Sequence, residues 1–370
     1  MVLAAVPPQV CVLALGVNGL SLLLLQWGRI TATNLHPFPF MCSLTAFLLV
    51  AFYSSNIFRN PKAVISDLSN PAALPGLSAG VATSSALVAR FGPVVLSGLG
   101  VQAGLFTCYV LALAVSLRFL QMCYRVGQWP DPSWFPAVLL ALMNYLQSQA
   151  SGPALLKAPG QFAFFTGIML PLLAVVAYRM CLSKARHSVA PHAGMALLMA
   201  PASFFCTVYL ATGKPYGDKL GSFLFACSTI FFLLTLRLLY VRRALWIGGF
   251  HPTYVAFTFP SASTATAALL ASEKLPEVAG LGALSRAWAG VLSVASVTVI
   301  MAVFVRMFVM LSAKILEPAA PSDWPGAYSQ AKISKEGKEN SQAKIHKEGK
   351  ENKLTHVASA DGTADHSKRD

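Results

Sequence analysis

Ten stretches of about 20 or more predominantly apolar residues follow one another along residues 1–316, and they constrain the fold more than any other feature. A helix needs about 20 apolar residues to cross the hydrocarbon core of a bilayer, so each stretch is long enough to span a membrane. The sequence therefore predicts an all-α integral membrane protein with ten transmembrane helices. The predicted spans cover residues 8–27, 37–57, 73–91, 93–124, 132–150, 158–181, 190–212, 217–241, 250–272 and 281–312.

Charge supports a membrane protein, because only 11% of the residues are charged, against about 25% in an average soluble domain. Nineteen basic and five acidic residues lie within 1–316, a bias that attracts anions into a water-filled path. Basic loops of any polytopic membrane protein give the same bias, and this second interpretation stays open. The loops hold nine cations on one side and seven, including Arg90, on the other. This difference weakly favours cytoplasmic termini.

Residues 317–370 differ from the rest of the chain, because their hydrophobicity is low and a 12-residue sequence is repeated at 329–340 and 341–352. A polar segment with balanced charge and few aromatic residues cannot bury enough surface to offset its ordering entropy. We therefore predict a disordered cytoplasmic tail beside a ten-span domain of residues 1–316. Ser329, Ser334 and Ser341 lie near lysines, which permits a kinase as a partner, although a solvated spacer is the simpler interpretation.

Motifs for catalysis are missing from the sequence, which has no HExxH, no usable GxSxG and no paired carboxylates. The seven cysteines show no CxxC spacing. We therefore expect no enzyme, no metal, no cofactor and no nucleic-acid partner. No Asp or Glu lies in the middle of a predicted span, whereas proton-coupled carriers usually need an intramembrane carboxylate or histidine. This favours passive conduction over coupled transport.

The ninth span contains Pro260 with six hydroxyl residues around it. These hydroxyls can re-satisfy backbone carbonyls near a proline in the middle of a helix, which is the structural explanation. They can also line a path for a partly dehydrated anion, which is the functional one. Helical spacing places four candidate pore residues on one face of this span: Val255, Phe259, Ser263 and Thr266.

The fifth span carries a second polar group, and its candidate pore-lining residues are Asn144, Tyr145, Ser148 and Gln149. Of these, Tyr145, Ser148 and Gln149 share a helix face. Three arginines fall within apolar stretches. Arg118 and Arg237 are close enough to helix ends to snorkel. Arg306 lies deeper and is a candidate for attracting anions.

Five motifs in register resemble the slow-type anion channels of plant guard cells, which belong with the bacterial tellurite-resistance and four-carbon dicarboxylate transporters. The motifs are LGVNGLSLL at 15–23, NPKAVISDLSNP at 60–71, MAPASFFCTVYL at 199–210, RLLYVRR at 237–243 and AFTFP at 256–260. The resemblance covers residues 8–312. It implies five helical hairpins around a central pore in each subunit, with odd-numbered helices lining the pore, and a homotrimer in the lipid bilayer.

The resemblance also implies a pore closed by an aromatic side chain. The family's gate phenylalanine matches Phe259, and a second pore phenylalanine is replaced here by Tyr145. We therefore predict a plasma-membrane anion channel for small inorganic anions such as chloride and nitrate, with malate as a further candidate. The alternative within the family is a proton-coupled dicarboxylate or sulfite transporter. A membrane receptor or scaffold whose tail recruits partners is a third hypothesis.

Overall fold

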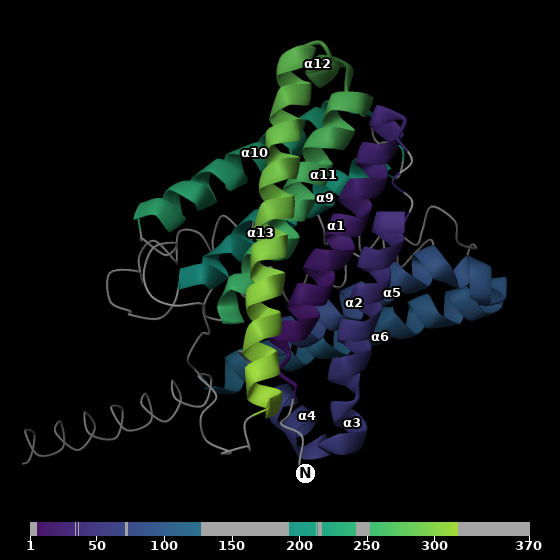
Figure 1. Cartoon of the computed structure of the whole chain (residues 1–370), viewed down its shortest axis with the longest axis vertical. Coiled ribbons are helices and arrows are strands. Elements are labelled where there is room, and N and C mark those ends of the chain that lie inside the picture. The colour runs from purple at the N-terminus through teal and green to yellow at the C-terminus, as the bar shows by residue number, and fades with distance from the viewer. Residues whose placement is uncertain are drawn as a thin grey trace, which may run out of the picture. The chain divides into compact units, whose positions relative to one another are not determined.

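The computed structural model describes residues 6–33, 35, 37–70, 73–126, 192–211, 213, 217–241 and 252–316. Contacts divide the chain into two units, of which Ala5–Ser312 holds the fold described below. The second unit is Met1–Ala4 with Ala313–Asp370, and only the end of one helix is described in it. Every regular element in the described ranges is a helix (Figure 1).

The long helices are α1 (Gln9–Thr31), α2 (Pro37–Ser54), α5 (Leu74–Val95), α6 (Gly98–Val126), α9 (Ala200–Ala211), α10 (Asp218–Val241), α11 (Thr258–Lys274) and α13 (Ala283–Leu316). Short elements join or extend them: α3 (Asn56–Arg59), α4 (Pro61–Leu68), α12 (Pro276–Ala279) and the 3-10 helices η3 (His192–Met199) and η4 (Pro252–Phe257).

Eight of the predicted spans fall on described residues, and each of them corresponds to a helix or to two consecutive helices. The predicted spans 132–150 and 158–181 lie outside the described residues. Within the described ranges, six helices are long and apolar enough to cross a membrane. The all-α membrane fold is therefore confirmed for this part of the chain, whereas the count of ten spans stays a prediction.

Burial separates the helices into an inner and an outer class. In their most apolar stretches, α1 and the η4–α11 segment bury 72% and 83% of their residues, whereas α2, α6, α10 and α13 bury between 22% and 33%. Ala200 to Leu210 of α9 are all buried, and α5 buries one face. Outer helices with exposed apolar residues suit a hydrocarbon environment, because water would penalise such a large apolar surface.

Helix α1 is central to the described part of the bundle, because it packs against α2, α5 and α11 (Figure 1). Helix α11 also packs against α9. One core cluster includes Leu15, Phe204 and Phe259 from α1, α9 and α11. A second cluster includes Val255 and residues of α1, α2 and α13. The inner helices α1, α9 and α11 thus meet around the predicted gate residue.

Candidate functional site

The predicted ninth span consists of two kinds of helix, with η4 ending at Phe257 and α11 beginning at Thr258. Pro260 therefore lies in the first turn of α11. The N–H groups of a first turn have no partner within their own helix, so a proline there removes no hydrogen bond within α11. The chain is helical without a break from Pro252 to Lys274, as expected, and the change of helix type lies directly before Phe259.

The hydroxyl groups around Pro260 fall into two sets. Four of them donate to backbone carbonyls: Thr258 to Val255 at 2.7 Å, Ser261 to Thr258 at 3.0 Å, Thr264 to Pro260 at 2.8 Å and Thr266 to Ala262 at 2.8 Å. Ser263 differs, because its Oγ has no hydrogen-bond partner among the described residues although its residue is only 5% exposed. An unsatisfied buried polar group costs about 1–3 kcal/mol. The Ser263 hydroxyl is thus the member of the stripe that is available to a ligand.

Phe259 lies one helical turn before Ser263 and is only 6% exposed. Its ring meets Phe204 of α9 edge to face, with 5.4 Å between ring centroids and 62° between ring planes. On the α1 side, a Cβ atom placed on Gly19 would lie 3.6 Å from Cδ2 of Phe259. The ring therefore packs between α1 and α9, at the meeting point of the inner helices.

Glycines allow α1 to approach α11 closely at this level. A Cβ atom on Gly16 would lie 2.1 Å from Thr258 Oγ1, and one on Gly19 would lie 3.1 Å from the Cβ of Ala262. The first distance is well below any van der Waals contact, so an unmoved backbone accommodates only glycine at position 16. Both glycines belong to the LGVNGLSLL motif, which thereby acquires a packing role beside the predicted gate.

The other predicted site residues have different environments. Val255 and Thr266 are buried like Phe259 and Ser263, but Val255 belongs to the second core cluster and the Thr266 hydroxyl is used within α11. Asn144, Tyr145, Ser148 and Gln149 lie outside the described residues. Arg306 is on α13 with an exposed side chain. Its role in attracting anions stays a prediction, as do the roles of the other residues.

Phe204 is a candidate functional residue that the sequence reasoning did not identify. It lies in the motif MAPASFFCTVYL, which carried the family resemblance but gave no indication of which aromatic residue faces Phe259. Thr207, one turn further along α9, donates from Oγ1 to the Ser263 carbonyl at 3.1 Å. Helix α9 therefore fixes both the ring and the backbone next to the unpaired hydroxyl.

Arg90 is the second residue that was missed. The sequence reasoning counted it among the loop cations, but it lies within α5 and is half-buried. Its Nη1 donates to Ser43 Oγ of α2 at 2.8 Å and to Ser21 Oγ of α1. Its guanidinium carbon lies 5.2 Å from the centroid of the Phe91 ring. A cation therefore stands among hydroxyls where α1, α2 and α5 meet.

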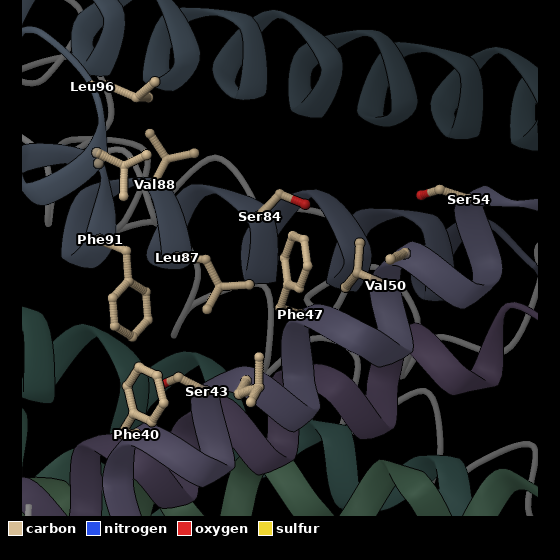
Figure 2. Close-up of a pocket in the computed structure, with 14 residues that line it drawn as sticks. Phe40, Ser43, Phe47, Val50, Ser54, Ser84, Leu87, Val88, Phe91 and Leu96 are labelled. Atoms are coloured by element: carbon tan, nitrogen blue, oxygen red, sulfur yellow. The ribbon is translucent and has the colours of Figure 1, made fainter.

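A cavity of about 570 Å³ lies between α2 and α5. Figure 2 shows Phe40 and Phe91 facing each other at one end beside Ser43, and their ring centroids are 6.0 Å apart. The lining is apolar except for Ser43, Ser54 and Ser84. Such walls do not support a hydrated path by themselves. Phe259 does not line this cavity, so the cavity is separate from the predicted gate.

Polar contacts join the segments at the N-terminal end of α1. The Asn56 side chain accepts from the backbone N–H of Val6 at 3.1 Å and donates to the Val6 carbonyl at 2.7 Å. In the α4 segment between α2 and α5, Asp67 accepts a hydrogen bond from the Tyr53 hydroxyl at 2.8 Å. Burial raises the pKa of Asp67 above its ordinary value of 3.8, and the Tyr53 hydrogen bond opposes this shift.

Different contacts join the inner helices at the C-terminal end of α1. Gln26 donates from Nε2 to Glu273 Oε2 at the end of α11. Lys274 donates from Nζ to the Leu210 carbonyl at 2.9 Å, near the end of α9. A lysine near the last carbonyls of a helix also interacts favourably with the helix dipole. The ends of α1, α9 and α11 are thereby joined at one level.

The part of the chain that the structure describes contains no cluster of metal-binding side chains. No group of three or more His, Cys, Asp or Glu residues there could hold a metal ion. Five cysteines whose side chains are described are free: Cys11, Cys42, Cys108, Cys206 and Cys227. The described helices offer an aromatic pair and an unpaired hydroxyl on α9 and α11 and a half-buried cation on α5, which are groups that exclude or bind an anion.

Buried inner helices surrounded by outer helices with exposed apolar faces define a helical integral membrane protein. A model of the voltage-dependent anion channel family (SLAC1) matches residues 5–308, and the chain belongs to this family. The sequence-based resemblance is thereby confirmed, and the protein is an anion channel or transporter. A comparison with curated proteins gave no match.

Proposed function

We propose that the chain is a passive channel for small inorganic anions, with chloride and nitrate as substrates and malate as a further candidate. Its path runs along the inner helices α1, α9 and α11 and is closed by Phe259. The observation that carries this proposal is the buried Phe259 ring, packed against Phe204 at 5.4 Å and one turn away from the unpaired Ser263 hydroxyl.

Closure follows from the chemistry of the ring. An anion that passes an apolar constriction loses hydration, and Phe204 and Gly19, the recorded neighbours of the Phe259 ring, carry no charge to compensate for that loss. The path opens when the ring rotates or when α11 shifts. Gly19 contributes no side chain on the α1 side, so the neighbouring helix does not lock the ring with a rotamer of its own. Ser263 then donates a hydrogen bond to the anion next to the constriction.

The distribution of acids supports a channel over a proton-coupled carrier. In the six apolar helices that the structure describes, no Asp or Glu lies in the middle of the span, and Asp218 and Glu273 lie near helix ends. A coupled carrier needs an intramembrane group that takes up the proton. Proton-coupled transport of a dicarboxylate or sulfite is therefore the alternative that an experiment has to separate.

The same proposal includes the finer predictions from the sequence. Tyr145 forms a second constriction, and the path is also lined by Val255, Thr266, Asn144, Ser148 and Gln149, with Arg306 attracting anions. The protein is a homotrimer in the plasma membrane with both termini in the cytoplasm. A kinase that acts on the 317–370 tail is a candidate regulator.

The test is voltage-clamp recording from cells that express the full chain, with chloride exchanged for nitrate or malate at two external pH values. A channel gives a current whose reversal potential follows the anion gradient and does not change with pH. If labelled malate moves only when a proton gradient is imposed, the protein is a coupled carrier. A chain without any anion flux, with partners bound through its tail, is a scaffold.

A further inference from the structure

Arg90 has hydrogen-bond donors that no described residue uses. Both of its recorded side-chain hydrogen bonds leave from Nη1, to Ser21 and Ser43. The N–H groups on Nε and Nη2 have no acceptor among the described residues, and no described carboxylate forms an ion pair with this arginine. The guanidinium therefore keeps its charge and the edge that forms paired hydrogen bonds.

The two serines are oriented by their own hydrogen bonds. Ser21 donates to the Pro39 carbonyl at 2.6 Å. The Ser43 hydroxyl has two acceptors within reach, which are Ser21 Oγ at 2.9 Å and Asn18 Oδ1 at 3.4 Å. With their protons directed to these acceptors, both hydroxyls present lone pairs to Nη1 of Arg90. Neutral hydroxyls thus hold the guanidinium in place without cancelling its charge, as a carboxylate would.

A dissolved oxyanion and a lipid phosphate both offer acceptor oxygens to this cluster, which lies within the helices. Ser21 lies ten residues before the end of α1 at Thr31, and Ser43 lies six residues after the start of α2 at Pro37. At 1.5 Å per residue these positions are about 15 Å and about 9 Å from the helix ends. Arg90 itself lies five residues before the end of α5 at Val95, near enough to a helix end for its side chain to snorkel, so the experiment below has to separate the two sources.

Space exists beside the cluster. Ser43 and Phe91, which both contact Arg90, line the end of the cavity between α2 and α5, whereas Arg90 itself does not line it (Figure 2). A guanidinium edge donates two parallel hydrogen bonds that match two oxygens of a planar oxyanion, whereas chloride offers a single acceptor atom. The arrangement therefore favours an oxyanion over a halide.

We propose that Arg90, held by Ser21 and Ser43, forms an oxyanion-binding site for nitrate or a carboxylate, and that this site raises the preference for nitrate over chloride. The inference rests on the proposed channel function for its effect on permeation, but binding itself does not depend on conduction. The site is separate from the constriction at Phe259, because it is built by α1, α2 and α5.

The permeation test compares the nitrate-to-chloride permeability ratio of the wild type with Arg90→Lys, which keeps the charge but removes the paired donors. We expect the ratio to fall at least about tenfold, as for the loss of one charge-assisted hydrogen bond. Arg118→Lys on α6 is the matched control, because Arg118 is half-buried like Arg90 but its hydrogen bonds go to Leu68 and Gln121. If Arg90→Lys conducts with the same nitrate-to-chloride permeability ratio as the wild type, the proposal of an oxyanion site at Arg90 is wrong.

A binding measurement separates this inference from the proposed function. The full chain is unfolded thermally in phospholipid-free detergent, with nitrate or chloride at equal ionic strength. We expect nitrate to raise the unfolding temperature more than chloride does in the wild type, and this difference to disappear in Arg90→Lys. Equal effects of the two anions on the wild type refute the site, even if the protein conducts. A wild type without anion current refutes the proposed function, and the binding result then decides the site.

Two further arms complete the test. Ser43→Ala removes one hydrogen-bond partner of the guanidinium but leaves the guanidinium itself. It should therefore reduce the difference between the nitrate and chloride effects on the unfolding temperature by less than Arg90→Lys does. Ser43→Ala also replaces Arg90→Lys as the test if that variant does not fold. An unchanged nitrate difference in Ser43→Ala counts against the assigned geometry. Phosphatidylglycerol is then added to the detergent-purified wild type. If it abolishes the nitrate effect, the site holds a lipid phosphate and the proposal of a dissolved oxyanion is wrong.

Discussion

The contact between Phe259 and Phe204 determines how strongly the proposed gate holds its closed position. An edge-to-face aromatic pair contributes about 0.5–1.5 kcal/mol beyond the burial of its area. Phe204→Leu keeps a large apolar side chain on α9 but removes the interaction between the rings. If only the closed state makes this contact, its loss shifts the equilibrium toward the open state by about two- to twelvefold.

The assay for Phe204→Leu is the resting anion current at a fixed voltage, divided by the amount of protein at the cell surface. Phe119→Leu is the matched control, because Phe119 is only 1% exposed but lies on the outer helix α6 in another cluster. We expect a two- to twelvefold rise for Phe204→Leu and no rise for the control. An unchanged current in Phe204→Leu, or an equal rise in both variants, would refute the role of the aromatic pair.

Three further substitutions test neighbouring parts of the structure. Ser263→Ala removes the unpaired hydroxyl and should lower the single-channel conductance without loss of stability, whereas Thr266→Val, which removes a hydroxyl used within α11, should not change the conductance. An unaltered conductance in Ser263→Ala would exclude this hydroxyl from the path. Gly16→Ala places a Cβ atom 2.1 Å from Thr258 Oγ1, so it should lower the free energy of unfolding by about 1–3 kcal/mol. A wild-type unfolding temperature would show that α1 and α11 separate without cost. Asp67→Asn tests the raised pKa of Asp67. The folded state binds the proton of the Asp67 carboxyl group more tightly than the unfolded chain does. The contribution of this group to stability is therefore complete below pH 3.8 and is lost as the pH rises through the raised pKa. The variant should flatten the corresponding fall in unfolding temperature with pH, and an unchanged slope would contradict the shift.

The helices of the described ranges could be predicted from the sequence because a chain in lipid must satisfy its backbone within each spanning segment. Hydropathy therefore located α1, α2, α10 and α13 to within a few residues. It did not predict the change from η4 to α11 at Thr258, because hydropathy does not distinguish a 3-10 helix from an α-helix. Hydropathy also gave no division into inner and outer helices, because lipid is as apolar as a helix interface.

The candidate site could be predicted in part. The sequence placed Ser263 and Thr266 on the Phe259 face, but hydrogen-bond geometry was needed to show that only the Ser263 hydroxyl of this stripe lacks a partner among the described residues. Arg90 was assigned to a loop because its position near the end of a predicted span resembles a flanking charge. Its partners Ser21 and Ser43 are 69 and 47 residues away in sequence, so only the packing of α1, α2 and α5 reveals the cluster.

Voltage-clamp current from Phe259→Ala, recorded beside the wild type and Phe119→Ala at equal surface expression, tests whether an aromatic side chain closes an anion path here. Each variant loses a buried ring, which costs about 3–5 kcal/mol of stability, so the two share the structural penalty. We expect a large constitutive current only in Phe259→Ala, with a reversal potential that follows the chloride, nitrate or malate gradient. A correctly folded Phe259→Ala protein whose current equals that of the wild type would contradict the gate.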